Sequence, residues 1–264
     1  MKLIIFLALN LLLLTLVNAL ASDSKSLTLM RTGRDVDGII IYDRIEIMPD
    51  LQVVWKTASN GAKCPSEAGT YVGQITKEKF DEIFKLALAV EADKAIVPDG
   101  AKVERDSREA SNSMVLENDG KIRTIKIAGF PESVAALHEE LAFVRTKLTP
   151  QTGVRMQAAK IAQGVRVTFT HLGNIPFRLL VPKEASEAFY MQNRSQVKFK
   201  TAPGTRNVML SKDLVSKSYD IQSPLKKGDK YFIFYSGAAL AHHGDAGPDG
   251  KLPAAQEVAL CAEF

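Results

Sequence analysis

The sequence predicts an α+β first half, in which an antiparallel sheet carries two helices on one face, followed by an all-β sandwich. Apolar residues recur at helical spacing in two segments, and both lie before residue 150. Strand patterns with tight-turn residues precede each helical segment, and beyond residue 153 only short alternating strands remain. The order hairpin, helix, hairpin, helix favours helices on one face of a sheet, whereas many short strands favour a sandwich.

The first expected hairpin and helix lie between residues 39 and 90. Residues 39–47 alternate between β-branched and polar side chains, and Pro49-Asp50 turns the chain back into a second strand at 51–55. Thr76 is expected to cap a helix, because its hydroxyl can accept a hydrogen bond from a backbone N–H of the first turn. The apolar residues at helical spacing are Phe80, Ile83, Phe84, Ala87, Leu88 and Val90.

The second expected hairpin surrounds the tight-turn sequence Asn118-Asp119-Gly120, with strands at 114–116 and 122–127. Pro131 suits the first turn of the second helix, which we expect to end near Leu148. The apolar residues of that helix are Val134, Leu137, Leu141 and Val144.

The second half of the chain is expected to consist of short strands separated by Gly and Pro turns. We expect these strands at 165–170, 177–181, 197–200, 208–210, 219–221, 231–235 and 258–261. The expected boundaries are a leader at 1–21, an α+β domain at 22–148, a linker at 149–153 and a β-sandwich domain at 154–264.

Residues 1–21 have the pattern of a secretory signal peptide. Lys2 supplies the positive start, an apolar run follows, and Ala19-Leu20-Ala21 matches the small-x-small pattern of a cleavage site. The apolar run is shorter than the roughly 20 residues that span a membrane. No cysteine lies near the cleavage site to carry a lipid. We therefore expect a periplasmic or secreted protein without a membrane span.

The charge is distributed unevenly between the two halves. Residues 22–150 carry 18 Lys and Arg against 21 Asp and Glu (18 − 21 = −3), and residues 151–264 carry 15 against 9 (15 − 9 = +6). Two ordinary solvated surfaces would explain this difference. The alternative is that the second half binds a protein or an anionic component of the cell envelope. The scattered positive charge and the expected export argue against nucleic acid.

The chain has two cysteines, Cys64 and Cys261. An even number of cysteines in an exported chain is compatible with a disulfide bond. Two separate thiols are equally compatible, because the distance between the cysteines cannot be read from the sequence.

One loop near the end of the chain contains two imidazoles and two carboxylates, at His242, His243, Asp245 and Asp249. Both groups are ligands of Zn²⁺ or Ni²⁺, so this loop is a candidate site for a divalent metal. The spacing matches no established metal motif, and Gly and Pro residues are also typical of a long hairpin loop.

No arrangement of nucleophile, base and orienting group is visible, so we assign no catalytic or cofactor-binding residue. The remaining histidines are His138, on the expected exposed side of the second helix, and His171, beside a turn. We expect both to be solvated.

Two groups of short motifs resemble known bacterial families. Residues 73–80, followed by Asn118-Asp119-Gly120-Lys121 and 125–127, resemble a domain of unknown function found in bacterial envelope lipoproteins. Residues 165–169, 171–176 and 225–234 are similar to immunoglobulin-like modules, which include bacterial proteinase-inhibitor domains. The resemblance implies a small α+β domain joined to an immunoglobulin-like sandwich in an exported protein.

These observations favour a non-enzymatic extracytoplasmic protein of the bacterial envelope that binds a partner. A metal-binding protein or metal-dependent enzyme using residues 242–249 is the first alternative. A protease inhibitor that presents a loop of the sandwich is the second, and it rests on the resemblance alone.

Overall fold

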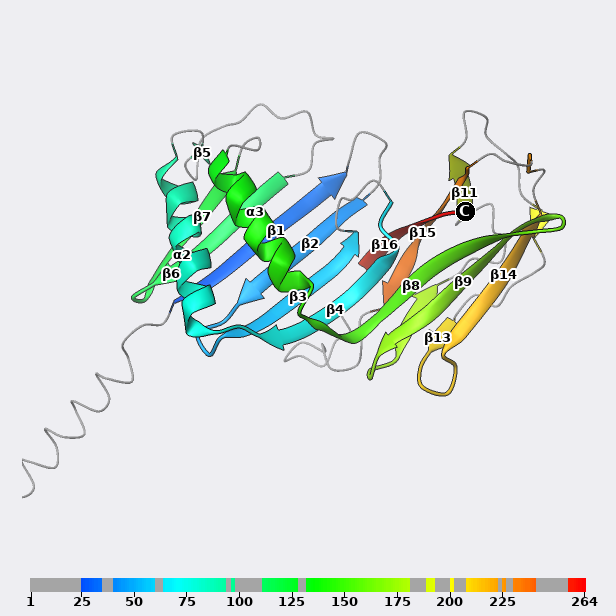
Figure 1. The fold of residues 1–264 in the computed structure, drawn as a ribbon, viewed down its shortest axis with the longest axis horizontal. Coiled ribbons are helices and arrows are strands. Elements are labelled where there is room, and N and C mark those ends of the chain that lie inside the picture. Colours follow the sequence, from blue (N-terminus) through cyan, green and yellow to red (C-terminus); the bar gives the residue numbers. More distant parts are fainter. Residues whose placement is uncertain are drawn as a thin grey trace, which may run out of the picture.

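The computed structural model describes two antiparallel sheets and two helices (Figure 1). The described residues are 25–34, 40–59, 64–93, 96–97, 111–127, 132–180, 189–192, 200–201, 208–222, 225–226, 230–240 and 256–264. The expected leader at 1–21 therefore lies outside the described residues.

The larger sheet contains eleven strands and runs through both halves of the chain, in the order β12-β14-β9-β8-β4-β3-β2-β1-β6-β7-β5. We call it the large sheet. Its strands are β1 (Ser26–Arg34), β2 (Ile40–Ile47), β3 (Gln52–Ser59), β4 (Glu67–Gln74), β5 (Ile96–Val97), β6 (Ser111–Asn118), β7 (Lys121–Ile127), β8 (Thr149–Ile161), β9 (Gly164–Gly173), β12 (Lys200–Thr201) and β14 (Ser216–Gln222).

The small sheet contains five strands, and the long strand β15 pairs with three of the others. One edge of β15 pairs with β16 along almost its whole length, and the other edge pairs with β11 and β10 in turn. The fifth strand, β13, extends the sheet beyond β10. The strands are β10 (Phe177–Leu180), β11 (Phe189–Gln192), β13 (Val208–Leu210), β15 (Phe232–Leu240) and β16 (Gln256–Glu263).

The predicted fold class, an α+β domain with two helices on one sheet face followed by an immunoglobulin-like sandwich, is wrong. The described chain is mostly β, and one antiparallel sheet joins the two halves because β8 pairs with β4 on one side and with β9 on the other. Residues 149–153, expected to be a linker, form the beginning of β8. Gly153 suits this position because a Cβ there would lie 2.6 Å from the backbone oxygen of Ala68 in β4.

The two helices, α2 (Lys77–Ala92) and α3 (Glu132–Arg145), pack against one another and against the first half of the large sheet. The expected cap of α2 is confirmed, since Thr76 Oγ1 accepts a hydrogen bond from the backbone N–H of Lys79 at 3.2 Å. One apolar core forms between the helices and strands β1, β2, β3, β6 and β7. Its helical members are Phe80, Ile83, Phe84, Ala87, Val90, Val134, Leu137, Leu141 and Val144.

A second core lies between the two sheets, which pack face to face as a β-sandwich. Phe169 of β9, Phe189 of β11 and Tyr235 of β15 form its aromatic centre. The Phe169 ring lies 5.1 Å from that of Tyr235 and 6.0 Å from that of Phe189, measured between centroids. Large buried rings of this kind contribute strongly to the stability of a core.

None of the helices in the described part of the chain is both long enough and apolar enough to cross a lipid bilayer.

Candidate functional site

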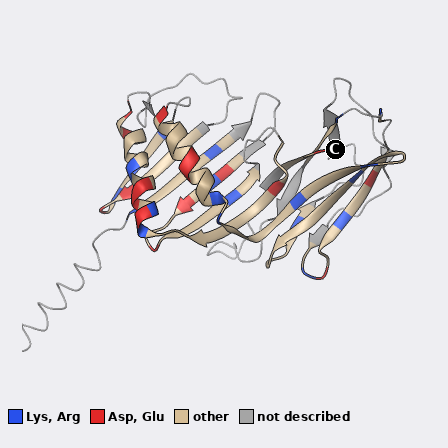
Figure 2. Ribbon diagram, viewed as in Figure 1, with Lys and Arg blue, Asp and Glu red and all other residues tan. Residues whose placement is uncertain are grey.

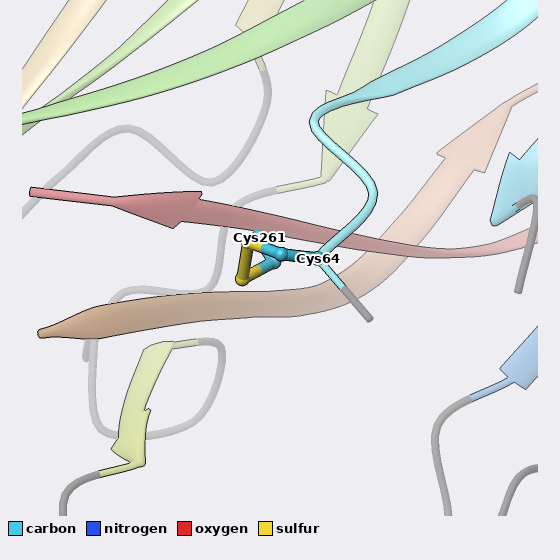
Figure 3. Close-up of a disulfide and its surroundings, with 2 residues drawn as sticks. All are labelled: Cys64 and Cys261. Atoms are coloured by element: carbon cyan, nitrogen blue, oxygen red, sulfur yellow. A yellow bond between two sulfur atoms is a disulfide. The ribbon is translucent and has the colours of Figure 1, made fainter. Parts of the chain in front are cut away.

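A disulfide bond joins Cys64, just before β4, to Cys261 in β16 (Figure 3). The Cα atoms are 4.8 Å apart, although the residues are separated by 197 positions in the sequence. The structure therefore decides between the two alternatives that the sequence leaves open, in favour of the bond. Cys261 is fully buried, whereas Cys64 is partly exposed.

Two backbone hydrogen bonds reinforce this connection between the sheets. The backbone N–H of Cys261 donates to the carbonyl of Pro65 at 2.6 Å, and the N–H of Met156 in β8 donates to the carbonyl of Ser66 at 2.8 Å. Residues 64–66 thus bind β16 of the small sheet on one side and β8 of the large sheet on the other. We call residues 64–66 together with Cys261 the clasp.

A buried carboxylate lies where α3 meets the large sheet. Asp43 of β2 is only 4% exposed. Its Oδ1 accepts a hydrogen bond from Trp55 Nε1 at 2.5 Å, and its Oδ2 accepts one from Arg145 Nη2, in the last turn of α3, at 2.8 Å. The Arg145 guanidinium also lies 5.3 Å from the centroid of the Trp55 ring. These contacts hold the carboxylate in one position.

Strand register brings two further polar residues beside this carboxylate. Arg31 of β1 and Thr57 of β3 are the direct cross-strand neighbours of Asp43. His138 lies seven residues before Arg145, about two turns earlier on α3, so the two side chains project from the same side of the helix. We call Arg31, Asp43, Trp55, Thr57, His138 and Arg145 the Asp43 cluster.

Burial and nearby charges shift two pKa values in this cluster. Burial raises the pKa of the Asp43 carboxyl, although Arg145, Trp55 and Arg31 act in the opposite direction. Burial lowers the pKa of His138 to about 4, and the positive charges of Arg145 and Arg31 add to this effect. A histidine in this environment remains neutral near neutral pH.

Both histidines expected to be solvated are at least partly buried, so that expectation is wrong. His138 borders the buried stripe of α3, because Val134 and Leu141 lie one turn away on either side. His171 is buried in β9, and its Nε2 lies 2.8 Å from the carbonyl oxygen of Ile175. The segment after His171 brings the Ile175 carbonyl to its ring nitrogen, which the turn alone did not indicate.

Beyond the helices, one face of β8, β9 and β14 exposes paired polar side chains. Arg166 forms two hydrogen bonds to the carboxylate of Asp220, at 2.6 and 2.7 Å, and the hydroxyls of Thr168 and Ser218 are 2.8 Å apart. In the adjacent row, Arg155 bonds Glu67 of β4 at 2.6 Å. We call the face formed by Arg155, Gln157, Arg166, Thr168, Ser218 and Asp220 the open face.

The charges of the described residues differ between this region and the helices. Figure 2 shows mainly acidic positions on α2 and α3 and mainly basic positions on β8, β9 and β14. Of these basic residues, Arg155 and Arg166 lie on the open face, where they pair with Glu67 and Asp220.

The predicted metal ligands His242, His243, Asp245 and Asp249 lie outside the described residues, so that site stays a prediction. Within the described ranges, no group of three or more His, Cys, Asp or Glu side chains is arranged to hold a metal ion.

The Asp43 cluster was missed from the sequence, although one signal pointed to it. Asp43 has the same parity as Ile45 and Ile47, so it occupies the apolar face of its strand. A charged residue at such a position requires a buried partner. That partner, Arg145, is 102 residues away and cannot be identified from strand alternation. Comparisons with protein-family models, with curated proteins and with solved structures found no match to this chain.

Proposed function

We propose that this chain is a non-enzymatic binding protein that is exported from a bacterial cell and acts in the periplasm or outside. The observation that carries the export part of this proposal is the disulfide between Cys64 and Cys261. Disulfide bonds persist in oxidising compartments and are rare in the bacterial cytosol. The signal-peptide pattern of residues 1–21 independently supports the same compartment.

The binding part of the proposal is supported by the open face. Its side chains project from a sheet whose other face is buried in the sandwich core, so the backbone that carries them is fixed before binding. A fixed backbone loses little conformational entropy when a partner binds, and the net positive charge of residues 151–264 attracts an anionic surface. The proposed partner is a protein or an anionic component of the cell envelope.

The test begins with the mature chain, residues 22–264, immobilised in its oxidised form and exposed to an extract of the cell envelope. A partner is accepted only when free mature protein competes for it and when the purified partner binds with a measurable Kd. Ser218→Glu introduces a large, negatively charged side chain on β14 within the open face and is expected to weaken binding at least about tenfold. Lys85→Glu, on the exposed side of α2, serves as the control and should leave Kd unchanged.

Two results would contradict the proposal. The first is the absence of a competable partner. The second is chemical conversion of the captured molecule by the mature protein, which would indicate an enzyme. Equal loss of binding in Ser218→Glu and Lys85→Glu would show that the open face is not the binding surface.

A further inference from the structure

We propose that the Asp43 cluster is a binding site for one small oxyanion, namely a carboxylate or phosphate group of a ligand. Three polar atoms at this place have no hydrogen-bond partner within the part of the chain that the structure describes. They are Nε of Arg31, Nε of Arg145 and Oγ1 of Thr57, and all three are buried. Buried donors are normally paired, so three unpaired ones around one carboxylate indicate a ligand.

The charges in the cluster favour an anion. Arg31 and Arg145 contribute two positive charges and an ionised Asp43 contributes one negative charge, a balance of +1. Burying an uncompensated charge is unfavourable, and a bound anion removes much of that cost. Because burial raises the pKa of Asp43, protonation of its carboxyl increases the positive balance at lower pH.

The strands and the helix that carry the donors are fixed before any ligand binds. Arg31 and Thr57 belong to strands on either side of β2 and lie in register with Asp43. Arg145 is fixed from the other side by its hydrogen bond to Asp43 and by its position over Trp55. Thr57, only 5% exposed, has a hydroxyl that can donate to an oxyanion. A guanidinium edge beside a hydroxyl suits the oxygens of a carboxylate or a phosphate.

This inference goes beyond the proposed binding function. The Asp43 cluster lies between α3 and strands β1 to β3, whereas the open face lies on β8, β9 and β14. Either proposal can therefore fail while the other holds, and the two tests use different variants.

The experiment is a titration of the oxidised mature protein with sodium acetate and, separately, with inorganic phosphate, followed by NMR of the arginine Nε–H groups. We expect saturable shifts of the Arg31 and Arg145 signals with one common Kd. The signals are assigned by comparison with Arg31→Met and Arg145→Met. The Nε–H of Arg166, which is paired with Asp220 on the surface, is the internal control and should not show saturable binding. The anion with the lower Kd identifies the anionic group of the ligand.

Thr57→Val keeps the shape of the side chain and removes its hydroxyl, so it should raise Kd about tenfold, as expected for one hydrogen bond to a charged group. Thr57→Ser keeps the hydroxyl and should retain the wild-type Kd. The indole N–H signal of Trp55, the one tryptophan of the chain, reports that each variant is folded. Absence of saturation, equal shifts at Arg166, or an unchanged Kd in Thr57→Val would each overturn the proposal.

Discussion

Removing the disulfide by Cys64→Ser should strongly destabilise the folded protein. The bond closes a loop that spans 197 positions of sequence. Loop-closure entropy at that length corresponds to about 5 kcal/mol of stabilisation at 25 °C, acting mainly by restricting the unfolded chain. Because the backbone hydrogen bonds at Pro65 and Ser66 can persist without the bond, we expect an observed loss of about 3 to 5 kcal/mol.

The assay is equilibrium unfolding in urea at pH 7, with the free energy of unfolding obtained by linear extrapolation. Two samples should agree, namely Cys64→Ser and the wild-type protein after reduction, because both lack the cross-link. The dependence of the free energy on urea should also be steeper without the bond, since the unfolded chain then exposes more surface. A loss below about 1 kcal/mol in both samples would refute the argument that the clasp restricts the unfolded state.

Three further predictions concern individual residues and segments. Lowering the pH from 6.5 towards 4 should destabilise the protein through His138. The pKa of His138 is about 4 in the folded state, against 6.5 normally. Between these two values the unfolded chain binds a proton that the folded chain does not, so the free energy of unfolding falls. With a discount for partial exposure this amounts to about 1 to 2 kcal/mol, and unfolding of His138→Gln across the same range should show a shallower pH dependence. Gly153→Ala should lower the free energy of unfolding by about 2 kcal/mol or more, because the new Cβ would lie 2.6 Å from the Ala68 carbonyl oxygen. An unchanged midpoint of urea unfolding would argue against the close contact between β4 and β8. If the 242–249 loop binds a metal, calorimetric titration should show that Zn²⁺ binds the wild-type protein and does not bind the double variant His242→Ala/His243→Ala. Equal heats of binding for both proteins would show that this loop is not a metal site.

The elements that could be predicted from the sequence are those whose signals are local. α2 was predicted because apolar spacing and a capping threonine coincide at its start. The tight turn between β6 and β7 was predicted from Asn118-Asp119-Gly120. Asp119 and Gly120 there adopt φ values of 52° and 72°, which these two residue types tolerate best.

The features that were missed depend on contacts between distant segments. The beginning of β8 contains Pro and Gly and reads as a linker, yet it pairs with β4 through a close approach of two glycines. The Asp43 cluster depends on the register of three strands and on the position at which α3 ends. Neither register nor helix packing has a local signal, so the continuity of the large sheet could not be predicted.

The proposed export and the covalent connection between the two sheets can be tested in one experiment. The most direct test is the intact mass of the protein recovered from the producing bacterium, denatured without reductant and treated with a thiol-alkylating reagent. We predict a chain that begins at Ser22 and carries no alkyl group, because Cys64 and Cys261 are joined. A chain that keeps Met1 and carries two alkyl groups would contradict both the export and the disulfide bond.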